Sequence, residues 1–81
     1  MIIRTLFFAS YRELLGTGHL TLELAEAATV SDLLEEVRGR GAGAAQLPAD
    51  PVVAVNREFA SMDTVLTDGD EVALVPPVAG G

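Results

Sequence analysis

The chain has 81 residues, of which 49% are hydrophobic and none is cysteine, and its formal net charge is −7. This length allows a single domain, and the lack of cysteine excludes disulfides, thiolate-bound metals and a cysteine nucleophile. Twelve acidic residues stand against five arginines, without any lysine, so nucleic acid is a poor partner and a basic protein surface is a better one.

Hydropathy and the N-terminal pattern set the expected location. No stretch approaches the roughly 20 consecutive apolar residues that a bilayer-spanning helix needs, so we expect no membrane association. The N-terminal run alternates like a strand and has no small-residue cleavage site behind it, which argues against a secretory signal. We therefore expect a cytoplasmic location.

The first part of the chain predicts two strands with a short helix between them. Residues 2–9, IIRTLFFA, are mostly β-branched and aromatic and predict the first strand. Residues 10–16, SYRELLG, predict one or two helical turns that end at Gly16. Residues 19–25, HLTLELA, alternate between apolar and polar side chains and predict the second strand. The short GTG link leaves little room for a crossover, so these two strands should be antiparallel neighbours.

The main helix is predicted to begin at Thr29. Thr29 and Asp32 have the spacing of a capping box, although Asp replaces the usual Glu. Apolar residues follow at positions i, i+3, i+4 and i+7, namely Val30, Leu33, Leu34 and Val37. These four side chains share one face, which we expect to lie across a sheet. Three glycines end the helix, and residues 42–50 predict an irregular connection.

The rest of the chain predicts three more strands. Residues 51–56, PVVAVN, form a continuous β-prone run that is typical of a strand well inside a sheet. A turn then leads to a short strand at residues 59–61. The turn signal Asp68-Gly69-Asp70 precedes the last strand, EVALVP, at residues 71–76.

The order of these elements predicts the fold class. Strand, strand, helix, strand, short strand and strand indicate an α+β protein with a mixed sheet of about five strands packed on one main helix. This pattern matches the ubiquitin-like β-grasp by analogy, and fold analogy alone does not license a function. We expect a β-grasp domain over residues 1–76 and a flexible C-terminal Gly-Gly tail at residues 77–81.

Catalytic side chains are scarce in the sequence. His19 is the sole histidine, and a lone histidine beside a turn is more often solvated than a base or a metal ligand. Asp68 and Asp70 lack the remaining positions of a calcium loop. The serines have no G-x-S-x-G context, and the glycine-rich segments lack the lysine of a P-loop. We therefore predict no metal site and no nucleophilic side chain.

The C-terminal segment VPPVAGG is the chemically unusual part of the chain. Pro76 and Pro77 favour an extended path away from the last strand. Gly80 and Gly81 have no Cβ, so their backbone can enter a narrow channel and present the terminal carbonyl to an attacking group. A carboxylate is a poor electrophile and must first be activated by another protein. This reasoning predicts a protein substrate rather than a catalyst.

Several segments together resemble a known family. LFFASYRELLG near the start, AVN at residues 54–56 and LTDGDEVALVPPVAGG at the end are similar to the MoaD family, the small subunit of molybdopterin synthase. The resemblance spans essentially the whole chain. A final Gly-Gly and DGDEVA also occur in other ubiquitin-like sulfur carriers, but their combination with PPVAGG and the opening segment is specific.

The resemblance implies a reaction sequence at Gly81. An E1-like, MoeB-like enzyme would use ATP and Mg²⁺ to adenylate the carboxylate of Gly81, and a sulfur donor protein would convert it to a thiocarboxylate. A MoaE-like large subunit would then take up the tail, where sulfur passes to cyclic pyranopterin monophosphate. In this scheme Gly80 gives clearance, the catalytic residues lie on the large subunit, and the chain itself binds no cofactor.

A docking surface is also predicted. One helix covers one face of a sheet, yet the first strand has apolar residues in both alternating sets. We predict that Phe8, Phe59 and Val75 form an apolar patch beside the tail, rimmed by acidic residues and facing a basic partner surface. The alternative is that these three residues belong to the core.

Three other functions remain open from the sequence. A sulfur carrier for thiamine synthesis shares the fold, the activation and the Gly-Gly end, but is usually shorter and lacks the two prolines. A ubiquitin-like protein modifier would transfer the Gly81 acyl group to a lysine of a target protein. An interaction domain with an unused tail is the simplest of the three.

Overall fold

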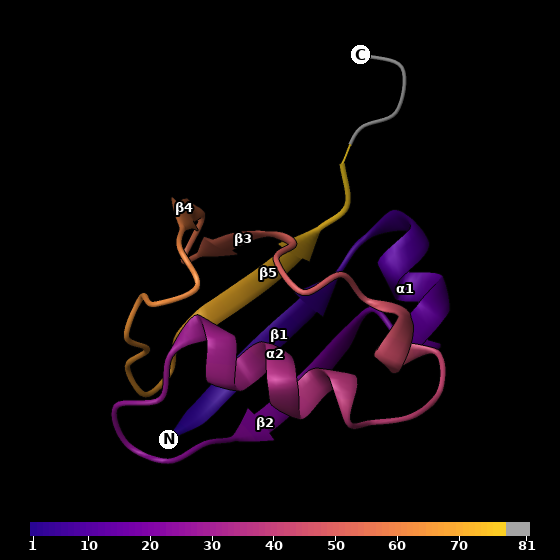
Figure 1. Cartoon of the computed structure of the whole chain (residues 1–81). Coiled ribbons are helices and arrows are strands. Elements are labelled where there is room, and N and C mark those ends of the chain that lie inside the picture. Colours follow the sequence, from indigo (N-terminus) through magenta and orange to yellow (C-terminus); the bar gives the residue numbers. More distant parts are fainter. Residues whose placement is uncertain (78–81) are drawn as a thin grey trace.

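The structure is a computed structural model and describes residues 1–77. Five strands and two helices, with one short 3₁₀ helix, follow each other along this part of the chain (Figure 1). In chain order they are β1 (Ile2–Phe7), α1 (Ala9–Leu15), β2 (His19–Glu23), α2 (Val30–Arg38), η1 (Ala44–Gln46), β3 (Val52–Val55), β4 (Glu58–Ala60) and β5 (Glu71–Val75).

The strands form one mixed sheet in the order β2-β1-β5-β3-β4. The first and the last strand, β1 and β5, are parallel neighbours near the centre, and every other pair is antiparallel. The predicted antiparallel pairing of the first two strands is confirmed, with Ile3 opposite Leu22 and Thr5 opposite Leu20. The α+β class and the mixed five-stranded sheet are confirmed as well.

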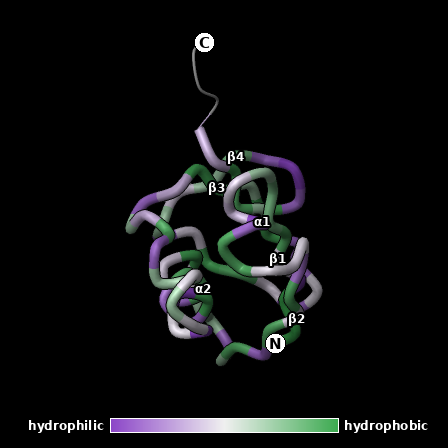
Figure 2. The backbone as a smooth tube through the Cα atoms, turned by 90° about the vertical axis from the view of Figure 1, so that its right-hand side faces the viewer, coloured by the Kyte–Doolittle hydropathy of each residue, from purple (hydrophilic) through white to green (hydrophobic). Residues whose placement is uncertain are grey.

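The core lies between the sheet and α2, which crosses one face of it (Figure 1). The side chain of every residue in the predicted apolar stripe of α2 is buried, and along this helix hydrophobic and hydrophilic residues alternate (Figure 2). From the sheet, β1 and β5 contribute alternate residues, including Ile3, Phe7, Val72 and Leu74. The buried core cluster comprises Ile3, Phe7, Tyr11, Leu22, Val30, Leu33, Leu34, Val37, Leu47, Val53, Leu66, Val72 and Leu74.

The predicted capping box of α2 is present. The backbone N–H of Asp32 donates to Thr29 Oγ1 at 3.3 Å, and the backbone N–H of Thr29 donates to Asp32 Oδ2 at 2.9 Å. Two N–H groups at the start of the helix are thereby satisfied, which fixes where α2 begins and how it enters the layer over the sheet.

Asp68, Gly69 and Asp70 form the predicted turn, and its carboxylates hold three strands together. Asp68 Oδ1 accepts from the backbone N–H of Ile2 at 2.7 Å, which ties the turn to the start of β1. Asp70 Oδ1 accepts from Asn56 Nδ2 at 2.8 Å, and Asn56 Oδ1 accepts from the backbone N–H of Glu71 at 3.0 Å. These bonds give both aspartates a structural role at the end of the sheet where β5 begins.

Several predicted boundaries were wrong by one or two residues. The strands β2, β3 and β5 are shorter than predicted. The first strand ends at Phe7 rather than residue 9, because Phe8 is the N-cap of α1 and Ala9 has a φ of +48°. The connection at residues 42–50 contains η1 instead of being wholly irregular. The fourth strand begins at Glu58 because Asn56 and Arg57, with φ values of +50° and +72°, make a two-residue turn. None of these shifts changes the topology.

No helix in residues 1–77 is both long and apolar enough to cross a bilayer. In the same residues, no three His, Cys, Asp or Glu side chains form a group that could hold a metal ion.

Candidate functional site: the open sheet face and the tail exit

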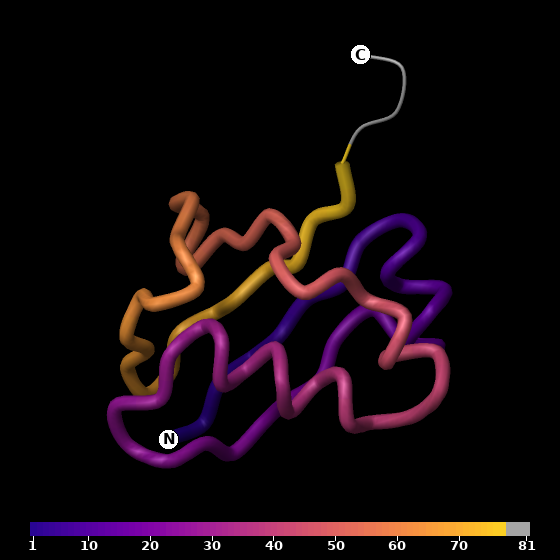
Figure 3. The backbone as a smooth tube through the Cα atoms, viewed as in Figure 1, coloured from indigo at the N-terminus to yellow at the C-terminus, as the bar shows by residue number. Residues whose placement is uncertain are grey.

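The chain leaves the sheet at the C-terminal end of β5. Because β1 and β5 are parallel, this end lies beside the end of β1. The backbone runs away from the sheet there, up to residue 77 (Figure 3). Pro76 is half-buried and Pro77 is exposed. Gly80 and Gly81 lie outside the described residues, so the predictions for these glycines, and for a flexible tail at residues 77–81, stay predictions.

The three predicted docking residues lie on strands or strand ends of the sheet. Phe8 is 47% exposed and Phe59 is 86% exposed, which separates both side chains from the core. Val75 is half-buried, on the face of β5 opposite the buried Val72 and Leu74. The register pairs Phe7 with Leu74, and Phe8 and Val75 are the residues that follow this last pair in the sequence.

The register brings further apolar residues onto the same face. Val75 is opposite Val52, which is 45% exposed. One row of paired residues runs across the sheet through Leu6, Ala73, Ala54 and Phe59. Together these residues form what we call the open-face patch, comprising Leu6, Phe8, Val52, Ala54, Phe59, Ala73 and Val75. Exposed apolar surface of this kind, next to a chain terminus, is typical of a protein-binding site.

The sequence prediction missed part of this patch. Val52 and Ala54 belong to the run PVVAVN, which is confirmed as a strand inside the sheet, between β5 and β4, but no exposed face was predicted for it. The strand in fact alternates, with Val53 buried at 1% exposure and Val52 exposed. The signal that could have identified Val52 is the period of two along a strand, which places Val52 and Ala54 on the face opposite Val53.

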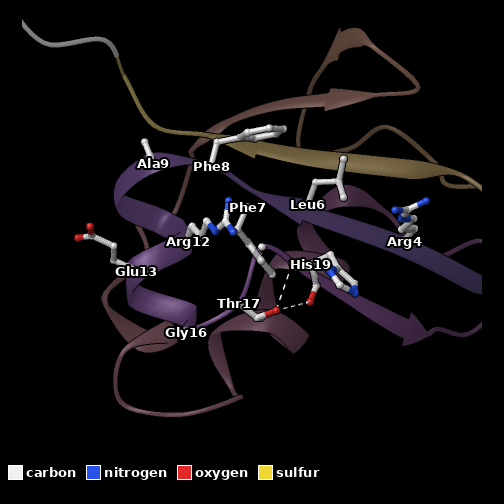
Figure 4. A pocket seen from close by; sticks show the side chains of 11 residues that line it. Arg4, Leu6, Phe7, Phe8, Ala9, Arg12, Glu13, Gly16, Thr17 and His19 are labelled. Carbon is white, nitrogen blue, oxygen red and sulfur yellow. Dashed lines mark hydrogen bonds between the residues drawn. The ribbon is translucent and has the colours of Figure 1, made fainter.

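The charge at the β1 side of the patch differs from the prediction. An acidic rim was expected, but a groove of about 1000 Å³ beside Phe8 is lined by Arg4, Arg12 and His19, with Glu13 as its acidic residue (Figure 4). The difference arises because α1 packs beside the end of β1 and brings Arg12 over it, a contact that strand periodicity does not reveal.

Two ionisable groups have shifted pKa values, and both shifts have structural causes. Burial raises the pKa of Tyr11, whose side chain belongs to the core. The Ser61 hydroxyl, which donates to Asp63 Oδ1 at 2.7 Å, lowers the pKa of that carboxyl, as does a backbone hydrogen bond. Neither residue belongs to the open-face patch, so the site depends on shape and apolar surface rather than on a tuned acid or base.

A central parallel pair formed by the first and last strands, with one helix across the sheet, defines a ubiquitin-like β-grasp protein. The crystal structure of SAMP1 from Haloferax volcanii has this fold, with a TM-score of 0.83, 29% identity and full coverage of both chains. Residues 5–81 match the ThiS family, and the chain belongs to that family.

Relatives of known name give a finer placement. The molybdopterin synthase sulfur carrier subunit of Escherichia coli is 43% identical over 99% of this chain and 100% of its own length. Small archaeal modifier protein 3 of Haloferax volcanii is 35% identical over 93% of this chain and 94% of its own length. The resemblance to the MoaD family that the sequence motifs indicated is thereby confirmed.

Proposed function

We propose that this chain is the sulfur carrier subunit of a molybdopterin synthase. The carboxylate of Gly81 is adenylated, becomes a thiocarboxylate and donates its sulfur to cyclic pyranopterin monophosphate. The observation that carries the proposal is the exit of the tail from the sheet beside the exposed Phe8, in a chain that ends in Gly-Gly. The Escherichia coli relative, a molybdopterin synthase sulfur carrier subunit, supports it.

Activation of Gly81 requires a second protein. A carboxylate resists nucleophilic attack, whereas an acyl-adenylate has AMP as a good leaving group. An E1-like, MoeB-like enzyme that uses ATP and Mg²⁺ supplies this step, and a sulfur donor protein replaces AMP by sulfur. Because Gly80 and Gly81 have no Cβ, the reacting carbonyl can reach the end of a narrow channel in either enzyme.

The open-face patch is the docking surface in this proposal. A MoaE-like large subunit covers the patch, so that the adjoining tail enters its active site, where the catalytic residues lie. Aromatic side chains in the centre of such interfaces contribute most of the binding energy, which favours Phe8 and Phe59 as the main contacts.

Intact-mass analysis of the protein purified from its native cells tests the carrier function. One terminal oxygen replaced by sulfur is the expected finding, and the exchange should vanish when the gene of the activating enzyme is deleted. A strain whose chain carries Gly80→Ala is expected to lose molybdoenzyme activity. The matched control is Gly39→Ala, where a Cβ would meet backbone oxygens at 3.5 Å and longer, which is ordinary contact. Normal molybdoenzyme activity after deletion of both terminal glycines would contradict the proposal.

A protein modifier is the second candidate function, because one relative is named a small archaeal modifier protein. In that case Gly81 ends as an amide on a lysine of a target protein. Branched tryptic peptides in which a target lysine carries residues 58–81 of this chain, the segment after its last arginine, Arg57, would favour a modifier. If a strain that lacks this chain grows poorly and added thiamine restores its growth, the result would instead favour a carrier for thiamine synthesis.

A further inference from the structure

The groove beside Phe8 concentrates positive charge in an acidic protein. The chain has a net charge of −7 and five arginines, and two of those arginines line this single groove together with the sole histidine. Leu6 and Phe8 supply apolar surface in the same groove (Figure 4). Phe8 also belongs to the open-face patch, so the groove and the patch are continuous.

The guanidinium group of Arg12 packs against a fixed part of the backbone in this groove. A Cβ at Gly18 would lie 3.5 Å from both Cζ and Nε of Arg12, so the guanidinium group packs against the bare backbone of residue 18. Gly18 is itself fixed, because its carbonyl accepts from the backbone N–H of Phe7 at 2.9 Å. Next to it, Thr17 Oγ1 donates to the carbonyl of His19 at 3.1 Å and accepts from its N–H at 3.4 Å. The backbone of residues 17–19, on which Arg12 packs, is thus fixed by these hydrogen bonds.

The two arginines of the groove have no anionic partner within residues 1–77. The ion pair found in this part of the chain joins Arg40 to Glu36, at 3.9 Å. Glu13 follows Arg12 directly on α1, and consecutive helical residues do not face each other. Arg12 therefore stays available to an external anion. Arg4 is less free, because the sheet register places it beside Glu71, although no ion pair joins them.

We propose that this groove binds an acidic segment of the protein partner that covers the open-face patch, with a partner carboxylate on the guanidinium group of Arg12. The inference rests on the proposed function and adds the chemistry of the partner surface. A guanidinium group presents parallel N–H donors that match the two oxygens of a carboxylate. A longer polyanion such as nucleic acid fits less well, because the net charge of −7 repels it outside the groove.

This contact gives the docking a direction that apolar burial alone lacks. Hydrophobic contact is non-directional, so the open-face patch could be covered in several orientations. A carboxylate held by Arg12 at one end of the patch would fix one orientation, and with it the position of the tail root at Pro76. The partner surface opposite β1 and α1 is thus acidic, in contrast to the basic surface expected from net charge.

Titration calorimetry with the large synthase subunit of the same organism tests the proposal. Arg12→Gln is compared with Arg40→Gln, which removes the same charge from an exposed ion pair away from the groove. We expect Arg12→Gln to weaken binding by about tenfold or more and Arg40→Gln to leave it unchanged. The wild-type affinity should fall with added salt, and the Arg12→Gln affinity should fall less steeply. Equal thermal unfolding midpoints of both variants will show that the fold is retained.

The possible outcomes separate the two proposals. Equal affinity of Arg12→Gln and Arg40→Gln overturns the acidic-segment inference and leaves the proposed function standing. Failure of the wild type to bind the large subunit overturns both. Binding of single-stranded RNA by the wild type, lost in Arg12→Gln, would assign the groove to nucleic acid and also overturn the inference.

Discussion

Thr5 places a hydroxyl group in the middle of the hydrophobic core. The residue lies on β1 between the buried Ile3 and Phe7, its own exposure is 0%, and its Oγ1 atom has no hydrogen-bond partner among residues 1–77. A buried hydroxyl without a partner loses its hydrogen bonds to water and gains none in return. Thr5 is therefore a point where the sequence does not maximise stability.

Replacing Thr5 by Val is expected to stabilise the protein. Valine keeps the shape of threonine and removes the unpaired oxygen, so the free energy of unfolding should rise by about 1 kcal/mol. For a domain of this size, that corresponds to a rise of roughly 4–8 °C in the unfolding midpoint, measurable by circular dichroism. Thr21→Val is the matched control on the exposed side of β2 and should change little. A lower midpoint for Thr5→Val would show that the hydroxyl has a partner in solution.

At the scale of elements, α1 and η1 meet through a glycine. A Cβ on Gly43 would clash with the backbone oxygen of Leu14, near the end of α1. Gly43 itself has ordinary helical angles, with φ at −65° and ψ at −47°, so close packing and not backbone conformation requires glycine there. This contact holds the connection after α2 against the first helix.

Gly43→Ala is expected to destabilise the protein, because the backbone of Leu14 has to move away from the new methyl group. Overpacking of this kind typically costs about 1–3 kcal/mol, which chemical denaturation would detect. Gly39→Ala is the matched control, since its Cβ would meet only ordinary contacts. Similar stability of the two variants would mean that the junction between α1 and η1 is adaptable.

Element types were predictable from the sequence because their signals are local. The stripe of α2 follows from apolar spacing, its start from the Thr29 and Asp32 pair, and the end of α1 from Gly16, which adopts φ +72°. The pairing of β1 with β5 is not local, since about 65 residues separate them, and no pattern in the sequence indicated it. Likewise, the position of Arg12 over Gly18 depends on how α1 packs, which no periodicity in the sequence reports.

At the scale of the whole molecule, the sheet is asymmetric. One face is covered by α2 and contributes the core, whereas the other carries the open-face patch. The patch residues Phe8, Phe59 and Val75 were predictable because one helix cannot cover both faces of a sheet. The basic groove at its edge was not, because net charge says nothing about where charges lie.

Phe59→Asp is expected to separate binding from folding. Phe59 is 86% exposed, so its replacement should leave the unfolding midpoint nearly unchanged while it weakens binding of the large subunit by more than about 30-fold. Val65→Asp is the control, because Val65 is 60% exposed and lies outside the patch. Phe7→Asp, at a site with 2% exposure, should unfold the protein. Unfolding of Phe59→Asp, or unchanged affinity, would remove Phe59 from the docking surface.

The parallel pairing of β1 with β5 has a consequence during protein synthesis. β1 is synthesised before its neighbour at the centre of the sheet, Glu71–Val75, which lies more than 60 residues further along the chain. Contacts between distant residues form late, so the sheet closes only after residue 75 has been translated. A chain that stops early lacks the central strand and stays open to proteolysis. Each folded copy thus already carries β5, the strand that leads to Pro76.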